Sequence, residues 1–247
     1  GYPHKNLSGV GVAFKLAAAL SGDQEEVLRD YADMVCLGTV ADVMPLLGEN
    51  RTFVAQGLAS LANTRRPGIA ALMAESGCDP TNITASSIGF MLAPRINAAG
   101  RMGQIDLAVE LFLTQDPQRA AELAAALCDL NRQRQAVEST IYDQAISMIP
   151  SGSPPQALVL ADDTWHQGVV GIVASRMAEE YCCPTFLICV DGEHGKASSR
   201  SYGGFNLFTA LKSLAPLLES YGGHELAAGF TINRQQIPTF RQEIGRL

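Results

Sequence analysis

Residues 116–149 read DPQRAAELAAALCDLNRQRQAVESTIYDQAISMI. Asp116 is a favourable helix N-cap, and Pro117 is a favourable residue of a first turn. No glycine or proline follows before residue 150, and residues that favour helices dominate the run. A helix of about 30 residues would be roughly 45 Å long, more than a helix within one small core needs. The stretch therefore predicts a long helix that connects two domains.

The segments on either side of this helix differ in pattern. Residues 150–155, Pro-Ser-Gly-Ser-Pro-Pro, have the composition of a boundary loop. Beyond them, short apolar runs alternate with helical runs, which is typical of a small α/β domain built on a sheet. The expected helices cover residues 7–20, 24–31, 50–63, 67–75, 84–92, 105–113, 168–180, 206–218 and those from 235 on, and the expected strands cover 157–161, 185–190, 195–201 and 227–232. We predict an α/β fold in three parts, with boundaries at 1–115, 116–150 and 151–247.

The composition narrows the class of protein. Of the 247 residues, 47% are hydrophobic, which is enough for a packed core. No apolar run reaches the ~18 residues of a membrane span, so we expect no membrane association. The six cysteines form no C-x-x-C pair, which favours free thiols in a reducing cytoplasm. The chain does not begin with Met, and residues 240–247 have the pattern of an interrupted helix, so we expect a fragment of a longer protein.

The net charge of −7 argues against non-specific binding of nucleic acid through a basic surface. It does not exclude a nucleic-acid enzyme, because local cationic sites and bound divalent metal can offset an acidic chain. A nucleic-acid function would therefore depend on local groups of residues.

Two such groups precede the long helix. Arg95, Asn97 and Arg101 lie among small residues and glycines in residues 93–103. Arginine suits phosphate, and glycine lets the backbone approach a ligand; a glycine-rich turn with two surface arginines is the alternative. Asp42 ends a mostly apolar run and is a candidate metal ligand, or else a core Asp paired internally.

Three further groups follow the long helix. His166 stands where a strand is expected to lead into a helix, whose N-terminus can bind an anion. Ser199 and Arg200 belong to a run of hydroxyls and cations on an expected strand, which fits phosphate oxygens or a solvated edge. Gly222 and Gly223 precede His224, so a ligand could approach the backbone beside an imidazole, although a helix C-cap with a surface His fits too.

Trp165, just before His166, admits two interpretations. Its indole could stack on a base. A single Trp is more often a core residue.

In their residues and their order along the chain, these groups resemble the motifs of one family, the RecJ family within the DHH phosphoesterase superfamily. The resemblance rests on five motifs in family order: LSGVGVAFKL at 7–16, LGTVADV at 37–43, PRINAAGR at 94–101, WHQGVVGIVASR at 165–176 and GGH at 222–224. It covers nearly the whole chain, and five motifs in order are very specific.

The resemblance implies a fold and an activity. RecJ-like enzymes are cytoplasmic nucleases of DNA repair and recombination that remove nucleotides from the 5′ end of single-stranded DNA with Mn²⁺ or Mg²⁺. The three parts would then be the C-terminal part of a DHH domain, a connecting helix and a DHH-associated domain that binds substrate. Single-strand-binding protein or a helicase would be partners of the intact enzyme.

The resemblance also assigns roles to residues. Asp42 matches a metal-ligand Asp, and Arg95, Asn97 and Arg101 match a DNA-contacting segment. The substrate-binding positions of the second domain fall on His166, Ser199, Arg200, Gly222, Gly223 and His224. In one departure, the usual Gly-Ser-Ala-Arg-Ser reads Ala-Ser-Ser-Arg-Ser at 197–201.

In a second departure, the Asp-His-His motif and the earlier Asp motifs do not occur in the sequence. One Asp cannot hold two metal ions, so we expect the chain to be inactive by itself. Two alternatives remain: a phosphodiesterase of the same superfamily that acts on oligonucleotides or cyclic dinucleotides, and a non-catalytic module that binds nucleic acid.

Overall fold

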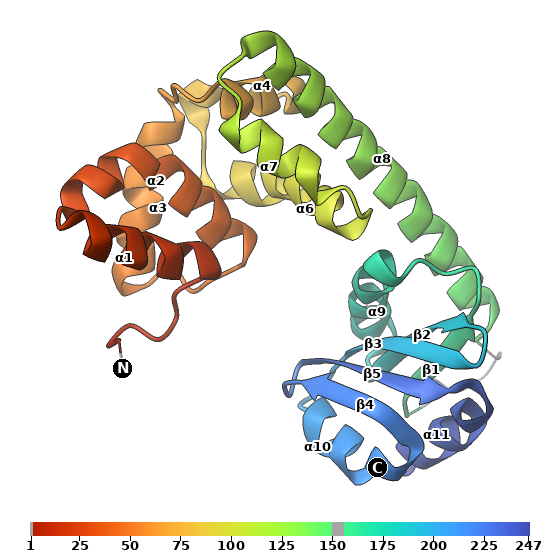
Figure 1. Ribbon diagram of the computed structural model, residues 1–247. Helices are drawn as coiled ribbons and strands as arrows, with labels where there is room; N and C mark the ends of the chain where they lie inside the picture. Colours follow the sequence, from red (N-terminus) through yellow and green to blue (C-terminus); the bar gives the residue numbers. More distant parts are fainter. Residues whose placement is uncertain (1, 150–155) are drawn as a thin grey trace. The chain divides into compact units, whose positions relative to one another are not determined.

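The computed structural model describes residues 2–149 and 156–247 (Figure 1). Its chain divides into two compact units, residues 1–133 and 134–247. The long helix is confirmed as α8, Pro117–Ser147, which contains the boundary between the units. The boundary loop predicted at 150–155 lies outside the described residues.

In its described part, the first unit is built from helices. They are α1 (Gly9–Ser21), α2 (Gln24–Ala41), α3 (Gly48–Leu61), α4 (Pro67–Ser76), η1 (Pro80–Asn82), α5 (Ala85–Ser87), η2 (Ile88–Leu92), α6 (Ala93–Arg101), α7 (Ile105–Leu113) and the first half of α8. The helix predicted for 24–31 continues ten residues further than expected, to Ala41. The stretch 93–101, considered above as a turn, is helix α6; η2, a π-helical turn, leads into it and places Pro94 in its first turn.

The close packing of α2 on α3 depends on one glycine. A Cβ at Gly57 would lie well inside van der Waals contact of the Cys36 side chain and the Ala32 carbonyl oxygen. Burial raises the pKa of the Cys36 thiol to about 12, so that thiol is unreactive at neutral pH. All six cysteines are free, as predicted.

Asp33 is a buried acidic residue of α2, and its carboxylate is paired. Asp33 is 4% exposed and accepts hydrogen bonds from Arg66 Nε at 3.2 Å and Thr64 Oγ1 at 3.3 Å. Asp42, in contrast, is exposed at the C-terminus of α2. Only Asp42 of these two carboxylates is therefore available to a ligand.

The second unit is a five-stranded sheet in the order β1-β2-β3-β5-β4. Its elements are β1 (Leu158–Asp162), α9 (Gln167–Tyr181), β2 (Thr185–Asp191), β3 (His194–Arg200), α10 (Leu207–Ser213), η3 (Ala215–Leu217), β4 (Leu218–Gly223), β5 (Ala227–Asn233), η4 (Arg234–Gln236) and α11 (Ile237–Ile244). β1 and β2 are parallel, and the other pairs are antiparallel. α9 covers one face over β2 and β3, and α10 and α11 cover the other (Figure 1). The predicted α/β fold is confirmed, although β4 was not predicted.

Both edges of this sheet carry a local irregularity. At the β1 edge, Arg241 Nε donates to the Val159 carbonyl oxygen at 2.9 Å. At the β4 edge, the register with β5 shifts between Leu218 and Ser220. Both features interrupt the regular row of backbone groups that an edge strand exposes.

The second half of α8 packs into the second unit through aromatic residues. Trp165 is 5% exposed, and its Nε1 donates to Gln144 Oε1 at 2.9 Å. The Arg176 guanidinium stacks over the Tyr142 ring, with Cζ 3.5 Å from the ring centroid. Trp165 is thus a core residue in this structure and is not exposed for stacking on a base.

Among the described residues, no helix is both long enough and apolar enough to cross a membrane.

Replacing Gly57 with Ala should destabilise the first unit by about 1–3 kcal/mol, because the added methyl group must displace Cys36 or the α2 backbone. Urea denaturation followed by circular dichroism measures this change. Gly9→Ala is the control: a Cβ there meets no atom within 4 Å, so its midpoint should stay the same or rise. Equal midpoints for Gly57→Ala and the parent would contradict the close packing.

Candidate nucleic-acid interface

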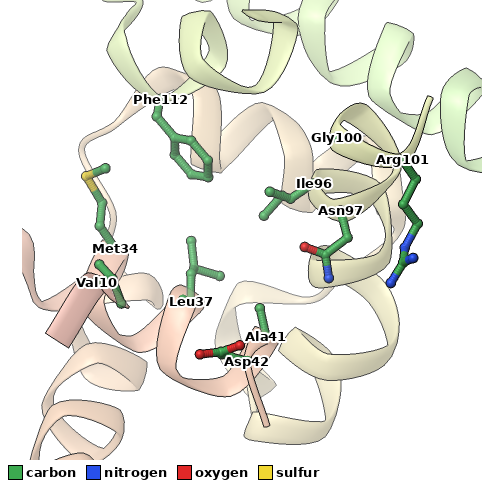
Figure 2. Close-up of a pocket in the computed structure, with 11 residues that line it drawn as sticks. Val10, Met34, Leu37, Ala41, Asp42, Ile96, Asn97, Gly100, Arg101 and Phe112 are labelled. Carbon is green, nitrogen blue, oxygen red and sulfur yellow. The ribbon is translucent and has the colours of Figure 1, made fainter. Parts of the chain in front are cut away.

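A pocket of about 640 Å³ in the first unit collects three of the predicted site residues (Figure 2). Asp42 comes from the end of α2, whereas Asn97 and Arg101 come from α6. Asn97 and Arg101 are four residues apart, so they lie on the same side of their helix. The rest of the lining is mostly apolar and comprises Val10, Met34, Leu37, Gly38, Ala41, Ile96, Gly100 and Phe112. The pocket thus combines a carboxylate, an amide and a guanidinium on an apolar base.

The backbone next to Asp42 is unusual. Asp42 is the C-cap of α2, and its N–H donates to the Gly38 carbonyl oxygen at 3.0 Å. Val43 follows with φ of 53°, a left-handed conformation that a β-branched residue rarely adopts. Such a conformation costs of order 1–3 kcal/mol and is often found at functional sites. It turns the chain abruptly just after the Asp42 carboxylate.

Arg95 does not line this pocket. Its Nε lies 3.1 Å from Cys128 Sγ on α8, and its Nη1 donates to the Met91 carbonyl oxygen. Arg95 is two residues before Asn97, and this spacing directs the two side chains to different sides of α6. In this structure Arg95 connects α6 to α8, and its predicted DNA contact is not part of the pocket.

The pocket residues do not form a metal site by themselves. A Mg²⁺ or Mn²⁺ ion needs several oxygen ligands, and Asp42 is the one carboxylate among the lining residues. Within the ranges 2–149 and 156–247, no three His, Cys, Asp or Glu side chains come together as a possible metal site. Further ligands would have to be supplied from outside these residues.

In the second unit, His166 is the N-cap of α9. Its Nδ1 accepts a hydrogen bond from the Gly168 N–H at 3.1 Å. The N–H groups of Val169 and Val170 donate to the His166 carbonyl oxygen, at 2.9 and 3.1 Å. The first turn is therefore largely satisfied internally, and what this helix end offers a ligand is the Nε2 side of His166.

Arg200 and Ser198 lie against the same helix. They are two residues apart on β3, so both face α9. A Cβ built on Gly171 would be 2.8 Å from Ser198 Oγ and 3.2 Å from Arg200 Nη2. Arg200 Nη1 also donates to the Ser199 carbonyl oxygen at 2.8 Å and lies 3.3 Å from Ser198 Oγ. The missing side chain at Gly171 makes room for the guanidinium.

Ser199 lies on the opposite side of β3 and is 0% exposed. Its Oγ has no hydrogen-bond partner among the described residues. A ligand that reaches Arg200 would meet Ser198 and not Ser199. The two-residue period of a strand, together with the position of Arg200, could have identified Ser198 from the sequence.

The hairpin between β4 and β5 holds His224 beside the end of β3. The His224 N–H donates to the Ala227 carbonyl oxygen at 2.9 Å, and Ala227 pairs with Arg200. The Ser201 N–H donates to the Leu226 carbonyl oxygen at 3.0 Å, which fixes the hairpin to the segment that follows Arg200. Gly223 has φ of 132°, a conformation that favours glycine.

His166 and His224 share one hydrogen-bonding arrangement. His224 Nδ1 accepts from the Leu226 N–H at 3.3 Å, as His166 Nδ1 accepts from Gly168. A neutral imidazole that accepts at Nδ1 carries its proton on Nε2. Both side chains can therefore donate Nε2–H to an anion.

Nuclear magnetic resonance can test these two tautomers. In the neutral form, ¹⁵N shifts should show unprotonated Nδ1 and protonated Nε2 for His166 and His224. The variants His166→Gln and His224→Gln assign the signals, because the chain has only four histidines. A proton on Nδ1 of either residue would contradict the arrangement.

Comparisons of the sequence and the fold with known proteins agree on one group of relatives. Residues 155–247 match the DHHA1 domain family. The single-stranded-DNA-specific exonuclease RecJ of Bacillus subtilis is 42% identical over 100% of this chain, which covers 31% of that protein. RecJ of Dickeya dadantii is 38% identical, again over 100% of this chain and over 47% of its own length.

Solved structures agree. RecJ of Thermus thermophilus in complex with Mg²⁺ superposes with a TM-score of 0.89 at 35% identity, over 99% of this chain and 38% of that one. An exonuclease RecJ bound to manganese gives 0.82 at 36% identity, over 62% of its length. The chain spans less than half of the length of the curated relatives it matches. The resemblance to the RecJ family is thus confirmed along the whole chain, of which residues 155–247 match the DHHA1 domain family.

Proposed function

We propose that this chain is the substrate-binding part of a nuclease that removes nucleotides from the 5′ end of single-stranded DNA. The observation that carries this proposal is the group formed by Arg200 and Ser198 against Gly171, within a chain that is similar to RecJ over its whole length. A terminal phosphate is the ligand that fits this group best. We therefore propose Arg200, His166, His224 and Ser198 as substrate-binding residues, with Ser198 in place of the predicted Ser199.

Arg200 would bind the phosphate. Its guanidinium offers several N–H donors in a plane, a geometry that matches two phosphate oxygens. Ser198 Oγ, 3.3 Å from Arg200 Nη1, adds a hydroxyl on the same side of the strand. His224 is on the hairpin joined to the end of β3, and its Nε2–H would donate to the phosphate or to the next one. Since these donors address phosphate and not base edges, binding should be independent of sequence.

The pocket of the first unit would hold the scissile region of the strand. Asp42 would be one ligand of a Mn²⁺ or Mg²⁺ ion, and Asn97 and Arg101 would contact the phosphodiester backbone. Crystal structures of relatives are described as complexes with Mg²⁺ and with Mn²⁺. Because Asp42 is the one carboxylate in the pocket, we assign no step of hydrolysis to the residues of this chain.

The wider setting follows from the same similarity. We propose a role in DNA repair and recombination in the cytoplasm, with single-strand-binding protein or a helicase as partner of the intact enzyme. A superfamily phosphodiesterase that acts on short oligonucleotides or cyclic dinucleotides is the alternative. The similarity to RecJ over 100% of this chain favours the exonuclease, and the dependence of affinity on oligonucleotide length separates the two.

The chain should bind a 5′-phosphorylated single-stranded oligonucleotide more tightly than the same oligonucleotide without the phosphate. Arg200→Ala should lower the affinity for the phosphorylated form about 10- to 100-fold, because a charge-assisted hydrogen bond contributes about 1.5–3 kcal/mol. Fluorescence anisotropy measures both affinities. His224→Ala should reduce the preference for the phosphate in the same direction.

Arg246→Ala is the matched control, because Arg246 is an exposed arginine of the same unit that pairs with Glu243 Oε1 at 2.7 Å. Its affinity should equal that of the parent. Equal loss in Arg246→Ala and Arg200→Ala would mean that only net charge matters, and the assigned phosphate site would then be wrong.

The chain alone should bind without hydrolysing. With Mn²⁺ present, a 5′-labelled single strand should remain intact after long incubation, because one carboxylate does not hold the ions that this hydrolysis needs. Gel electrophoresis of the labelled strand is the measurement. Release of labelled mononucleotide that is lost in Asp42→Ala would show that the chain holds a working metal site after all.

A further inference from the structure

The pocket of the first unit has a polar rim. Asp42, Asn97 and Arg101 are exposed, and they are the polar side chains among the described residues that line the pocket. The proposed function assigns all three to a metal ion and to the phosphodiester backbone. The pocket volume of about 640 Å³ lies within the ~300–1,000 Å³ of small-molecule sites. The pocket therefore has room for more of a nucleotide than its phosphate.

The interior of the pocket is apolar, and its side chains come from four helices. They are Val10 of α1, Met34 and Leu37 of α2, Ile96 of α6 and Phe112 of α7. Leu37 is buried, and the other four are half-buried. The side chains of Leu37, Ile96 and Phe112 point toward one another across the pocket (Figure 2). The half-buried side chains leave part of their apolar surface open to a ligand.

The division into a polar rim and an apolar interior matches the two parts of a nucleotide. One end of a nucleotide is a charged phosphate, and the other end is a base with a flat π-face. Phe112 lies well apart from both Asp42 and Arg101 in Figure 2. A nucleotide with its phosphate at the rim can therefore turn its base toward Phe112, and an aromatic ring is a good stacking partner for any base.

The interior also determines how a base is recognised. Its side chains are apolar, so they contact the face of a base and not its hydrogen-bonding edges. Met34 has a flexible, polarizable side chain that fills irregular gaps, which suits purines and pyrimidines alike. Such a site raises affinity without selecting a sequence, and the removal of successive nucleotides from any strand requires that property.

We propose that the apolar interior of this pocket holds the base of the nucleotide whose phosphate Asn97 and Arg101 bind, with the Phe112 ring stacked on that base. The proposal rests on the proposed function, which assigns the scissile region of the strand to this pocket. It adds Phe112, Met34 and Ile96 to the binding residues. One base of the bound strand, and not only its phosphates, then contributes to affinity.

Removal of single bases from the ligand tests this proposal. The ligands are a 5′-phosphorylated hexanucleotide of deoxythymidine and variants of it that carry one abasic residue, placed at each position in turn. For the parent chain, one abasic position should lower the affinity about tenfold, which is within the range for loss of one base–aromatic stack. The other positions should cost less. Fluorescence anisotropy measures these affinities.

The variant Phe112→Leu separates the stack from the fold. Leucine keeps an apolar side chain on α7 and removes the ring, so the variant should fold, as circular dichroism can check. The abasic residue at the sensitive position should then cost no more than at the others, because the stack is already lost. Phe90→Leu is the matched control, since Phe90 of η2 is 83% exposed and does not line the pocket. It should keep the parental penalty.

Nuclear magnetic resonance of the methionine methyl groups observes the interior directly. A base beside Met34 should shift its methyl signal through the ring current of the base, whereas the signal of Met148, in the second unit, should not move. A hexanucleotide with abasic residues throughout should leave the Met34 signal unchanged. The variants Met34→Leu and Met148→Leu assign the two signals among those of the seven methionines.

The outcomes are distinct. One sensitive position that is lost in Phe112→Leu, together with a base-dependent shift of Met34, supports the base site. Equal abasic penalties in the parent and Phe112→Leu, with no shift of Met34, overturn the base site. The proposed function stands in that case if Arg200→Ala still loses affinity for the phosphorylated strand. A parent without preference for the 5′-phosphate overturns the proposed function, and the base site with it.

Discussion

The second unit depends on the close approach of β3 to α9 at Gly171. A side chain at this position would occupy the space that Ser198 Oγ and Arg200 Nη2 now fill. The same contact holds the guanidinium beside the helix and orders the sheet under it. Arg200 Nη1 also donates to the Ser199 carbonyl oxygen at 2.8 Å, which fixes the guanidinium against its own strand.

In the first unit, two carboxylates of α2 and its C-cap have different surroundings. The buried Asp33 pairs with Arg66, whereas Asp42 is exposed at a helix end, next to Val43 with its positive φ. The ion pair makes the Asp33 carboxylate unavailable to a ligand. The unusual backbone conformation lies next to Asp42, as is common at functional sites.

The sequence predicted most elements because their composition is distinctive: after Pro117, α8 contains no glycine or proline, and β2 is a short, nearly continuous apolar run. It missed β4, since that strand is exposed for most of its length and ends in two glycines, so it shows neither alternation nor strand propensity. It left the second half of α2 unassigned because buried and polar residues mix there. For the site, the four-residue spacing of Asn97 and Arg101 survives in the helix, whereas Arg95 turns to α8 and Ser199 turns inward. The directions of these two side chains depend on which side of the helix or strand packs against a neighbour. Family motifs alone do not give that information.

The irregular edge at β4 has a consequence for self-association. A strand at the edge of a sheet offers its unpaired backbone groups to a strand of another copy, which is a common route to aggregation. The register shift between Leu218 and Ser220 interrupts the ladder at that edge, and Arg241 occupies a carbonyl at the other edge. Both edges of the sheet thus discourage growth into a larger sheet, even though β4 is exposed for most of its length.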